Sequence, residues 1–244
     1  MDQTITIKDL LEAGVHFGHR ARRWNPKMKP YIFGKKNDIF IIDLEKTLER
    51  IKIAADAMRR VAELGQDVLF VGTKQQAKPI IEEEAKRCGA FYVNERWLGG
   101  LLTNFEVVSN RISRLAELER ILSEGRTERY TKKELLKLER EYKKLLKIFA
   151  GVKEMDRLPG IIYLVDVVRE ATPLAEARRA KIPVVAMIDT NGDPEKIDYP
   201  IPSNDDALRS IKLITSIMAD AVLEGRKGFV DDTEAEKENE ATET

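Results

Sequence analysis

The sequence predicts an α/β protein in which a parallel sheet is covered by helices on both faces. Short apolar runs rich in β-branched and aromatic residues alternate along the chain with longer amphipathic stretches. Buried parallel strands and their crossover helices produce this pattern. The alternation is interrupted between Asn104 and about Met155, where helical spacing persists but no strand is indicated.

The elements follow in chain order. Strands are expected at residues 38–43, 68–71, 90–93, 161–165, 184–188 and, as a short one, 199–201. Amphipathic helices are expected at residues 44–64, 74–87, about 173–180 and about 204–225. The run at 38–43 is apolar between two charged ends, so it is predicted to be a buried strand.

The interruption predicts an antiparallel helical hairpin. Apolar residues recur at helical spacing over residues 112–122 and again over 135–149. Thr131 and Glu134 have the spacing of a capping box, in which each side chain satisfies a free backbone amide of the other. We therefore expect a coiled-coil hairpin at residues 104–155. Such a hairpin either meets a partner or is self-contained, and the sequence leaves both open.

The remaining chain is predicted to form one α/β domain, residues 1–103 and 156–229, followed by an acidic tail, residues 230–244. The formal net charge is zero, with 42 basic and 42 acidic side chains, but removing residues 231–244 leaves 41 basic against 35 acidic. The tail has no apolar residue larger than alanine. It cannot offset its own ordering entropy by burial, so we expect it to be disordered.

Composition narrows the class of protein. Charged residues make up 34% and hydrophobic residues 43%, which is typical of a folded soluble protein. No apolar run approaches the roughly 20 residues that cross a bilayer, and the N-terminus lacks the features of a signal peptide. Cys88 is alone, which excludes an internal disulfide or a cysteine-based zinc site. We therefore expect a cytoplasmic protein without a membrane partner.

Residues 13–37 form a basic arm without a single acidic side chain. Glycine and proline residues disfavour a regular helix, so an irregular arm is expected. Basic groups neutralise phosphates, and aromatic rings stack on splayed bases, so the arm predicts RNA binding; a solvated basic loop is the alternative. The candidate RNA-binding residues of the arm are Arg20, Arg22, Arg23, Trp24, Lys27, Lys29, Lys35 and Lys36.

Two further segments carry candidate RNA contacts. Gly72, Thr73 and Lys74 lie where a strand meets a helix, as in half of a phosphate-binding loop, although the full nucleotide-binding spacings are absent. Lys74 is a candidate contact for an RNA phosphate or, less favourably, a nucleotide phosphate. After the third strand come Arg96, Trp97 and Asn104, which flank or lie near a pair of glycines. Trp97 either meets RNA or packs over the end of the sheet.

A metal site is a weaker hypothesis. His16 and His19 are three residues apart, and Asp189, Asp205 and Asp206 sit near strand or helix ends. Imidazole and carboxylate groups are ligands for zinc or magnesium. The two aspartates at 205–206 would equally suit the first turn of the last helix. With only two histidines and one cysteine, a catalytic triad has little support, and we expect no cofactor beyond such an ion.

A series of short motifs runs through the chain. They are Gly14-Val15-His16-Phe17-Gly18-His19, Trp24-Asn25-Pro26-Lys27-Met28, Tyr31-Ile32-Phe33-Gly34, Phe70-Val71-Gly72-Thr73-Lys74, Arg96-Trp97-Leu98-Gly99-Gly100-Leu101-Leu102-Thr103-Asn104, Leu158-Pro159, Ile188-Asp189-Thr190-Asn191 and Ile201-Pro202-Ser203-Asn204-Asp205-Asp206-Ala207. In this order they resemble the bacterial small-subunit ribosomal protein S-two family. The resemblance runs from about residue 5 to residue 230, and the tail does not contribute to it.

That resemblance implies a Rossmann-like or flavodoxin-like parallel sheet with an inserted coiled-coil hairpin. It implies a structural, non-catalytic protein of the small ribosomal subunit that joins late and binds rRNA between head and body. It further implies neighbouring small-subunit ribosomal proteins as partners, among them the large S-one protein, which captures mRNA. The arm from Arg20 to Lys29 would lie on rRNA. We expect a ribosome-bound protein in the cytoplasm, not a homo-oligomer.

Two other functions fit parts of the sequence. A Rossmann-like enzyme would use a nucleotide or a phosphorylated substrate near Gly72–Lys74, but the missing phosphate-loop spacings disfavour it. A helical-hairpin adaptor would bind protein alone, which the acid-free arm disfavours. The fold by itself does not separate these functions.

Overall fold

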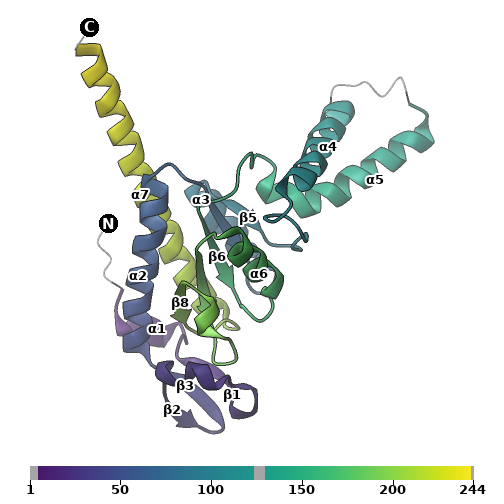
Figure 1. Ribbon diagram of the computed structural model, residues 1–244. Coiled ribbons are helices and arrows are strands. Elements are labelled where there is room, and N and C mark those ends of the chain that lie inside the picture. The colour runs from purple at the N-terminus through teal and green to yellow at the C-terminus, as the bar shows by residue number, and fades with distance from the viewer. Residues whose placement is uncertain (1–4, 124–129, 243–244) are drawn as a thin grey trace.

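The computed structural model describes residues 5–123 and 130–242, with side chains up to residue 229 (Figure 1). Its centre is a five-stranded sheet in the order β5-β4-β6-β7-β8, in which all neighbours are parallel. The strands are β4 (Val68–Val71), β5 (Phe91–Val93), β6 (Ile161–Val165), β7 (Val184–Ile188) and β8 (Tyr199–Pro202). The predicted parallel sheet is confirmed.

Helices cover both faces of this sheet. On one face lie α1 (Ile7–Glu12), α2 (Leu44–Glu63), α3 (Lys78–Cys88) and α7 (Leu208–Thr242), whose apolar residues share one core with Phe70 and Tyr163 of the sheet. On the other face, Leu174 of α6 (Ala171–Ala180) shares a second core with Leu69. Adjacent residues of β4 thus enter opposite cores, as strand geometry requires. No helix among the described residues is long and apolar enough to span a membrane.

The basic arm is more regular than expected. It contains β1 (Phe17–Arg20), η1 (Ala21–Arg23), η2 (Pro26–Tyr31) and β2 (Ile32–Lys36), and it forms a separate antiparallel sheet, β1-β3-β2, with β3 (Ile39–Ile42). The prediction that residues 38–43 form a buried strand was wrong, because only Ile42 of β3 is buried. Asn37 and Asp38 have φ values of 49° and 63°, the left-handed conformation of a tight hairpin turn, which folds β2 back onto β3.

Two helices occupy the interrupted region. They are α4 (Phe105–Ser123) and α5 (Lys132–Phe149), and the short η4 (Ala150–Val152) follows. The helices extend away from the sheet in Figure 1, and Arg114 of α4 pairs with Glu141 of α5 at 3.1 Å. The capping box at Thr131 is confirmed. Gly125, which would favour a turn between the two helices, lies outside the described residues. Supercoiling of the helices as a coiled coil stays a prediction.

The last helix is longer than expected. We predicted an end near Gly225 and a disordered tail from residue 230, whereas α7 continues as a helix to Thr242. Gly225 does not end the helix, because it packs directly on α2: an added Cβ would collide with the carbonyl oxygen of Arg59 and lie 2.8 Å from the Cβ of Ala62. Beyond Gly228 the chain has no further glycine or proline, and glutamate, alanine and lysine propagate a helix readily.

The carboxyl ends of all five strands lie at one edge of the sheet, and the site residues gather there. The chain leaves β4 at Gly72, β6 at Asp166 and β7 at Asp189. The arm is fastened to the same edge, because the Asn25 amide donates to the Thr190 carbonyl at 2.7 Å and the Asn204 amide donates to the Val15 carbonyl at 3.0 Å. In open α/β sheets, this edge is where ligands bind.

Candidate nucleic-acid interface

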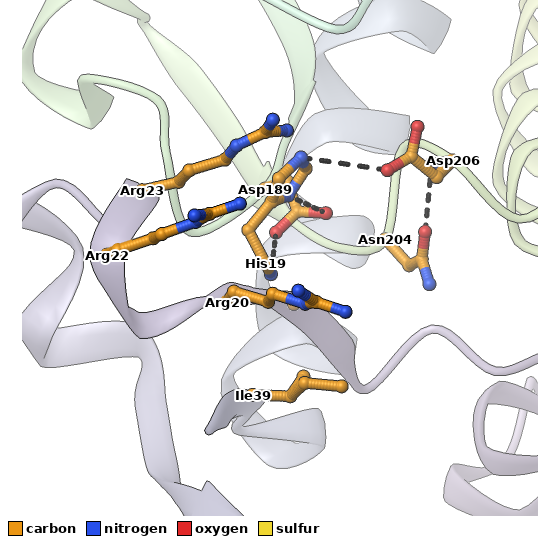
Figure 2. A pocket seen from close by; sticks show the side chains of 9 residues that line it. His19, Arg20, Arg22, Arg23, Ile39, Asp189, Asn204 and Asp206 are labelled. Atoms are coloured by element: carbon orange, nitrogen blue, oxygen red, sulfur yellow. Dashed lines mark hydrogen bonds and ion pairs between the residues drawn. The ribbon is translucent and has the colours of Figure 1, made fainter. Parts of the chain in front are cut away.

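Three arginines of the arm line a pocket of about 360 Å³ between the small sheet and the main sheet (Figure 2). Arg20 ends β1, and Arg22 and Arg23 belong to the following 3-10 turn, η1. All three side chains are exposed. Among the described residues, none of the three has a carboxylate within ion-pairing distance. Their charges therefore face solvent and are available to an anion.

The remaining candidate residues of the arm differ in whether their side chains already have partners within the protein. Lys29 and Lys36 are exposed, and no described carboxylate pairs with them. Lys27 pairs with Glu195 at 2.5 Å and Asp193 at 3.2 Å, next to η5 (Pro194–Lys196), while Lys35 pairs with Asp38 at 2.8 Å. Trp24 is half-buried, with its ring 4.8 Å from that of Phe40. The unpaired cations of the arm are thus Arg20, Arg22, Arg23, Lys29 and Lys36.

The wall of the pocket contains His19 between two aspartates. Its Nδ1 lies 3.0 Å from Asp189, and its Nε2 lies 3.6 Å from Asp206. The hydrogen bond that the His19 ring donates to Asp189 raises the pKa of His19. Asp189 also accepts hydrogen bonds from the backbone amides of His19 and Thr190, at 3.2 and 2.5 Å. This aspartate fixes the arm on the end of β7 and leaves little of its charge to repel an anion.

Lys74 points into a group of three carboxylates at the same edge, two of which are largely buried. Its Nζ lies 2.6 Å from Asp206, 2.8 Å from Asp205 and 3.1 Å from Asp166. Burial alone would lower the pKa of Lys74, but the three carboxylates together raise it, so this lysine stays charged. Burial, with Asp166 and Asp189 nearby, raises the pKa of Asp205 to about 7. Lys74 is therefore paired with carboxylates of the protein itself.

The loop after β4 carries its own anion. The backbone amide and hydroxyl of Thr73 donate to the Glu170 carboxylate, at 2.7 and 2.6 Å. Glu170 is 2% exposed, and burial raises its pKa. Gly72 is needed for close packing, since an added Cβ would lie 2.9 Å from Ile81 and 3.1 Å from Ala77. The groups that would hold a nucleotide phosphate here are occupied by the chain itself.

The loop after β5 is organised by a third buried acid. Glu176 of α6 accepts from the indole of Trp97 at 3.0 Å and from the amides of Gly100 and Leu102 at 2.8 and 3.1 Å. Trp97 is 9% exposed, so its ring packs inside rather than facing RNA. Arg96 and Asn104 are exposed. They lie beyond β5, at the opposite end of the strand order from the arm.

The proposed metal ligands are only partly brought together. His19, Asp189 and Asp206 each offer a ligand atom, and these atoms lie within 4.8 Å of one another. His16 is not part of this group; its ring lies 3.9 Å from that of Phe17, and burial lowers its pKa. Asp205 faces Lys74 instead. Three groups suit a divalent cation in type and number, and cation binding stays a hypothesis.

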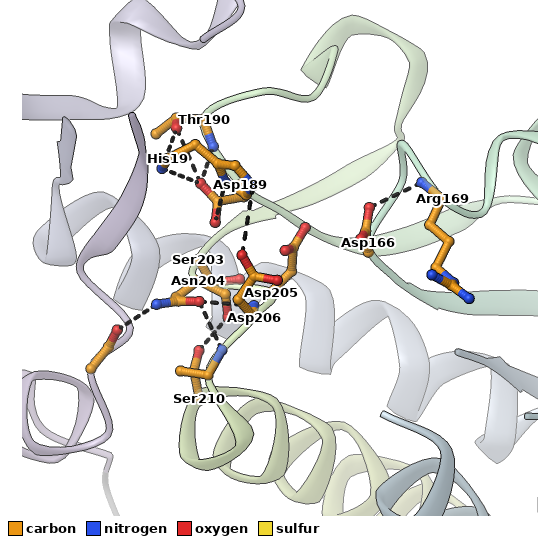
Figure 3. A network of polar contacts seen from close by, with 12 residues as sticks. His19, Asp166, Arg169, Asp189, Thr190, Ser203, Asn204, Asp205, Asp206 and Ser210 are labelled. Carbon is orange, nitrogen blue, oxygen red and sulfur yellow. Dashed lines mark hydrogen bonds and ion pairs between the residues drawn. The ribbon is translucent and has the colours of Figure 1, made fainter. Parts of the chain in front are cut away.

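The sequence did not single out several residues that build this edge (Figure 3). Asn204 accepts from the amides of Asp206 and Ala207 at 2.8 and 2.9 Å, and its side-chain amide donates to the Gly14 carbonyl at 3.3 Å. Its place just before the last helix is typical of a capping asparagine, which was a detectable feature. Glu170 directly precedes α6 and Glu176 lies within it, and nothing in the local sequence distinguishes either from an exposed glutamate.

The fold and this edge define the class of the molecule: an α/β protein of the parallel-sheet type, with a basic arm fastened at the carboxyl ends of its strands. Comparison with known families narrows the class. The family model for ribosomal protein S2 matches residues 10–225 of the chain. The chain therefore belongs to the ribosomal protein S2 family, which confirms the resemblance found in the motifs.

Membership of this family assigns the chain a general role. Ribosomal protein S2 is a structural component of the small ribosomal subunit. This subunit is a ribonucleoprotein that takes part in translation. The family is structural rather than enzymatic. The internal use of Thr73 and Lys74 agrees with this, because neither group is left to bind a nucleotide.

Proposed function

We propose that the chain binds small-subunit rRNA through the outer face of its basic arm. The observation that carries the proposal is the set of three exposed arginines, Arg20, Arg22 and Arg23, around one pocket, none of them within ion-pairing distance of a described carboxylate. Guanidinium groups bind phosphates through bidentate hydrogen bonds. The backbone amides of the arm are also hydrogen-bonded to the main sheet, so the backbone that carries the arginines is held in place.

Charge distribution supports the proposal at a second level. Beneath the arginines, the carboxylates of Asp189, Asp205 and Asp206 are engaged by His19 and Lys74. Asp189 and Asp205, each 2% exposed, are turned to these internal partners, whereas Asp206 is 57% exposed and shares the pocket wall with the arginines. A polyanion at the pocket thus meets three exposed guanidinium groups against one exposed carboxylate.

The test is the salt dependence of binding to small subunits from which this protein has been removed. Each phosphate contact contributes about 0.7–0.9 to the slope of log K against log salt. We expect the triple variant Arg20→Gln, Arg22→Gln, Arg23→Gln to lower that slope by about 2 to 3. A matched control removes three charges elsewhere, at the exposed Lys8, Lys52 and Lys212.

The outcomes separate clearly. A slope reduced only in the arginine variant supports docking of the arm on rRNA. An arginine variant that binds with the slope and affinity of the wild type would refute it. Thermal unfolding of both variants shows whether any loss of binding reflects loss of folding.

Finer features of the function rest on the family resemblance and belong to the same proposal. We propose that the chain sits between head and body of the small subunit in the cytoplasm and helps to retain the S-one protein. The inserted helices, α4 and α5, would reach a second surface of the particle as a hairpin. Cosedimentation of S-one protein with subunits that contain or lack this chain tests the retention.

A further inference from the structure

Helix α5 carries a row of five basic side chains on one face. They are Lys133, Lys137, Arg140, Lys144 and Lys147, and all five are exposed. We propose that this row is a second RNA-binding surface, which takes the phosphate backbone of duplex RNA without reading its sequence. The proposal rests on the proposed function as an rRNA-binding protein and adds a site distinct from the arm.

The spacing of the five residues makes the row continuous. They follow one another at intervals of four, three, four and three residues. At about 100° per residue, these intervals keep all five within an arc of about 80°. The row extends about 21 Å along the helix axis, since each residue advances it by about 1.5 Å. A duplex with one charge per about 1.7 Å of axis presents about twelve phosphates over that length.

The opposite face of α5 is apolar and turned toward the protein. Tyr142, Leu145 and Leu146 pack against the second core, and Phe149 is 2% exposed. The helix has three acids. Glu134 and Glu141 flank the row, but Glu134 closes the capping box and Glu141 pairs with Arg114 of α4. Glu139 lies farther round the helix from the row. The basic face is thereby directed away from the sheet.

The row is unfavourable for the helix itself. Lys133 and Lys137, like Arg140 and Lys144, are like charges at i and i+4, which repel each other in a helix. Only Lys147 has a carboxylate partner among the described residues, Glu95 at 3.6 Å. An exposed helix that served only itself would alternate its charges, as α4 does with three acidic and three basic residues. A polyanion outside the chain accounts for the difference.

The side chains of the row indicate the chemistry of the ligand. Four of the five are lysines, which bind phosphate as point charges and tolerate variation in geometry. No aromatic side chain lies in the row, so stacking on unpaired bases is not provided. At its end, Lys147 meets Glu95, the neighbour of the exposed Arg96. The row therefore leads to the loop after β5, where sequence analysis placed another RNA contact.

The first test neutralises three members of the row. We expect Lys133→Gln, Lys137→Gln, Lys144→Gln to lower the salt slope of binding to depleted small subunits by about 2 to 3. Glutamine has a helix propensity close to that of lysine, so the helix is retained. The control is the triple variant at Lys8, Lys52 and Lys212, with the slope of the wild type expected. An unchanged slope in the α5 variant overturns the inference.

The second test identifies the partner. A hydroxyl-radical source attached at Lys137→Cys should cleave rRNA at discrete positions, whereas one at Lys52→Cys should not. Cys88 is 1% exposed and is not expected to take the label. A loss of affinity with an unchanged slope and no cleavage from position 137 would assign the row to a protein partner and refute the RNA site.

The two proposals fail differently. If the α5 variant binds as the wild type does while the arm variant loses slope, only the second surface is wrong. If neither variant changes the slope, rRNA docking through charged side chains is wrong altogether, and the second surface falls with it.

Discussion

Lys74 is predicted to stabilise the fold rather than to bind RNA. Its side chain is 11% exposed and is held by Asp166, Asp205 and Asp206. Replacing it by methionine keeps the length of the side chain and removes the charge. Asp166 and Asp205, 14% and 2% exposed, then face each other without a cation. Breaking a buried ion pair by removing one partner costs about 3–5 kcal/mol.

Only the buried part of the cluster sets this magnitude. Asp206 is 57% exposed, so water screens its charge and its share is small. For a domain of this size, about 3–5 kcal/mol lowers the melting temperature by roughly 6 to 20 °C. Urea unfolding followed by circular dichroism measures the free energy directly. The salt slope of RNA binding should stay that of the wild type, because the Lys74 charge is paired with carboxylates of the protein.

A second substitution makes the result specific to charge. In the Lys74→Met background, Asp205→Asn removes the buried carboxylate that lost its partner, so it should recover part of the lost stability. In the wild type, the same substitution removes a favourable pair. If Lys74→Met costs less than about 1 kcal/mol, or if Asp205→Asn destabilises both backgrounds equally, the cluster is not an energetic unit. A reduced salt slope would return Lys74 to the RNA surface.

Three further predictions concern the other buried acids and the histidine. Glu170→Gln retains the acceptor for Thr73. Because burial raises the pKa of Glu170, the wild type should lose stability relative to this variant as the pH rises from about 4.5 through the folded pKa. Urea titrations of both proteins at several pH values should show this divergence, and a constant difference in stability would contradict it. Glu176→Ala leaves three donors unsatisfied, including the Trp97 indole. We expect the free energy of unfolding to fall by roughly 3 kcal/mol or more and the Trp97 emission to shift to the red. Unchanged emission would show that the loop does not depend on this acid. If a divalent cation binds at His19, then zinc or magnesium at about 100 times its Kd should stabilise the wild type by about 2.7 kcal/mol in thermal shift and leave His19→Ala unaffected; equal shifts in both would remove the hypothesis.

The parallel sheet was predictable because its strands are apolar throughout. Residues 161–165 and 184–188 are buried at every position, so no polar side chain obscures the pattern. The two inserted helices were predictable for a similar reason: each has one apolar face, and Thr131 with Glu134 marks the start of the second. Local sequence was sufficient wherever burial is complete or periodic.

The arm shows where local sequence was insufficient. Glycines and prolines suggested an irregular segment, but Asn37 and Asp38 adopt the left-handed conformation and close a hairpin. The small sheet that results is only partly buried, so its strands lack the continuous apolar pattern. Gly225 shows the converse: it marks close contact with α2, which depends on a residue far away in the chain. Tertiary packing decided both cases.

The candidate site was predictable in its exposed residues but not in its buried ones. The absence of acids over residues 13–37 is visible in sequence, whereas the assignment of Lys74 to three aspartates depends on how β4, β6 and β8 are brought together. Trp97 was left open between RNA and packing, and its bond to Glu176 resolves it as packing. The sequence shows which side chains are charged or aromatic, but it does not show whether each one points into the protein or toward solvent.

A chain with no net charge can still bind a polyanion if its charges are segregated. At the carboxyl edge of the sheet, the acids Asp205, Glu170 and Glu176 are buried and bonded to donors within the protein. The arm and the row of α5, by contrast, present exposed basic side chains in concentrated groups that a ligand can meet. Screening over about 8–10 Å limits the influence of each exposed group to its own neighbourhood. The local field, and not the sum of 42 acids and 42 bases, decides what the protein attracts.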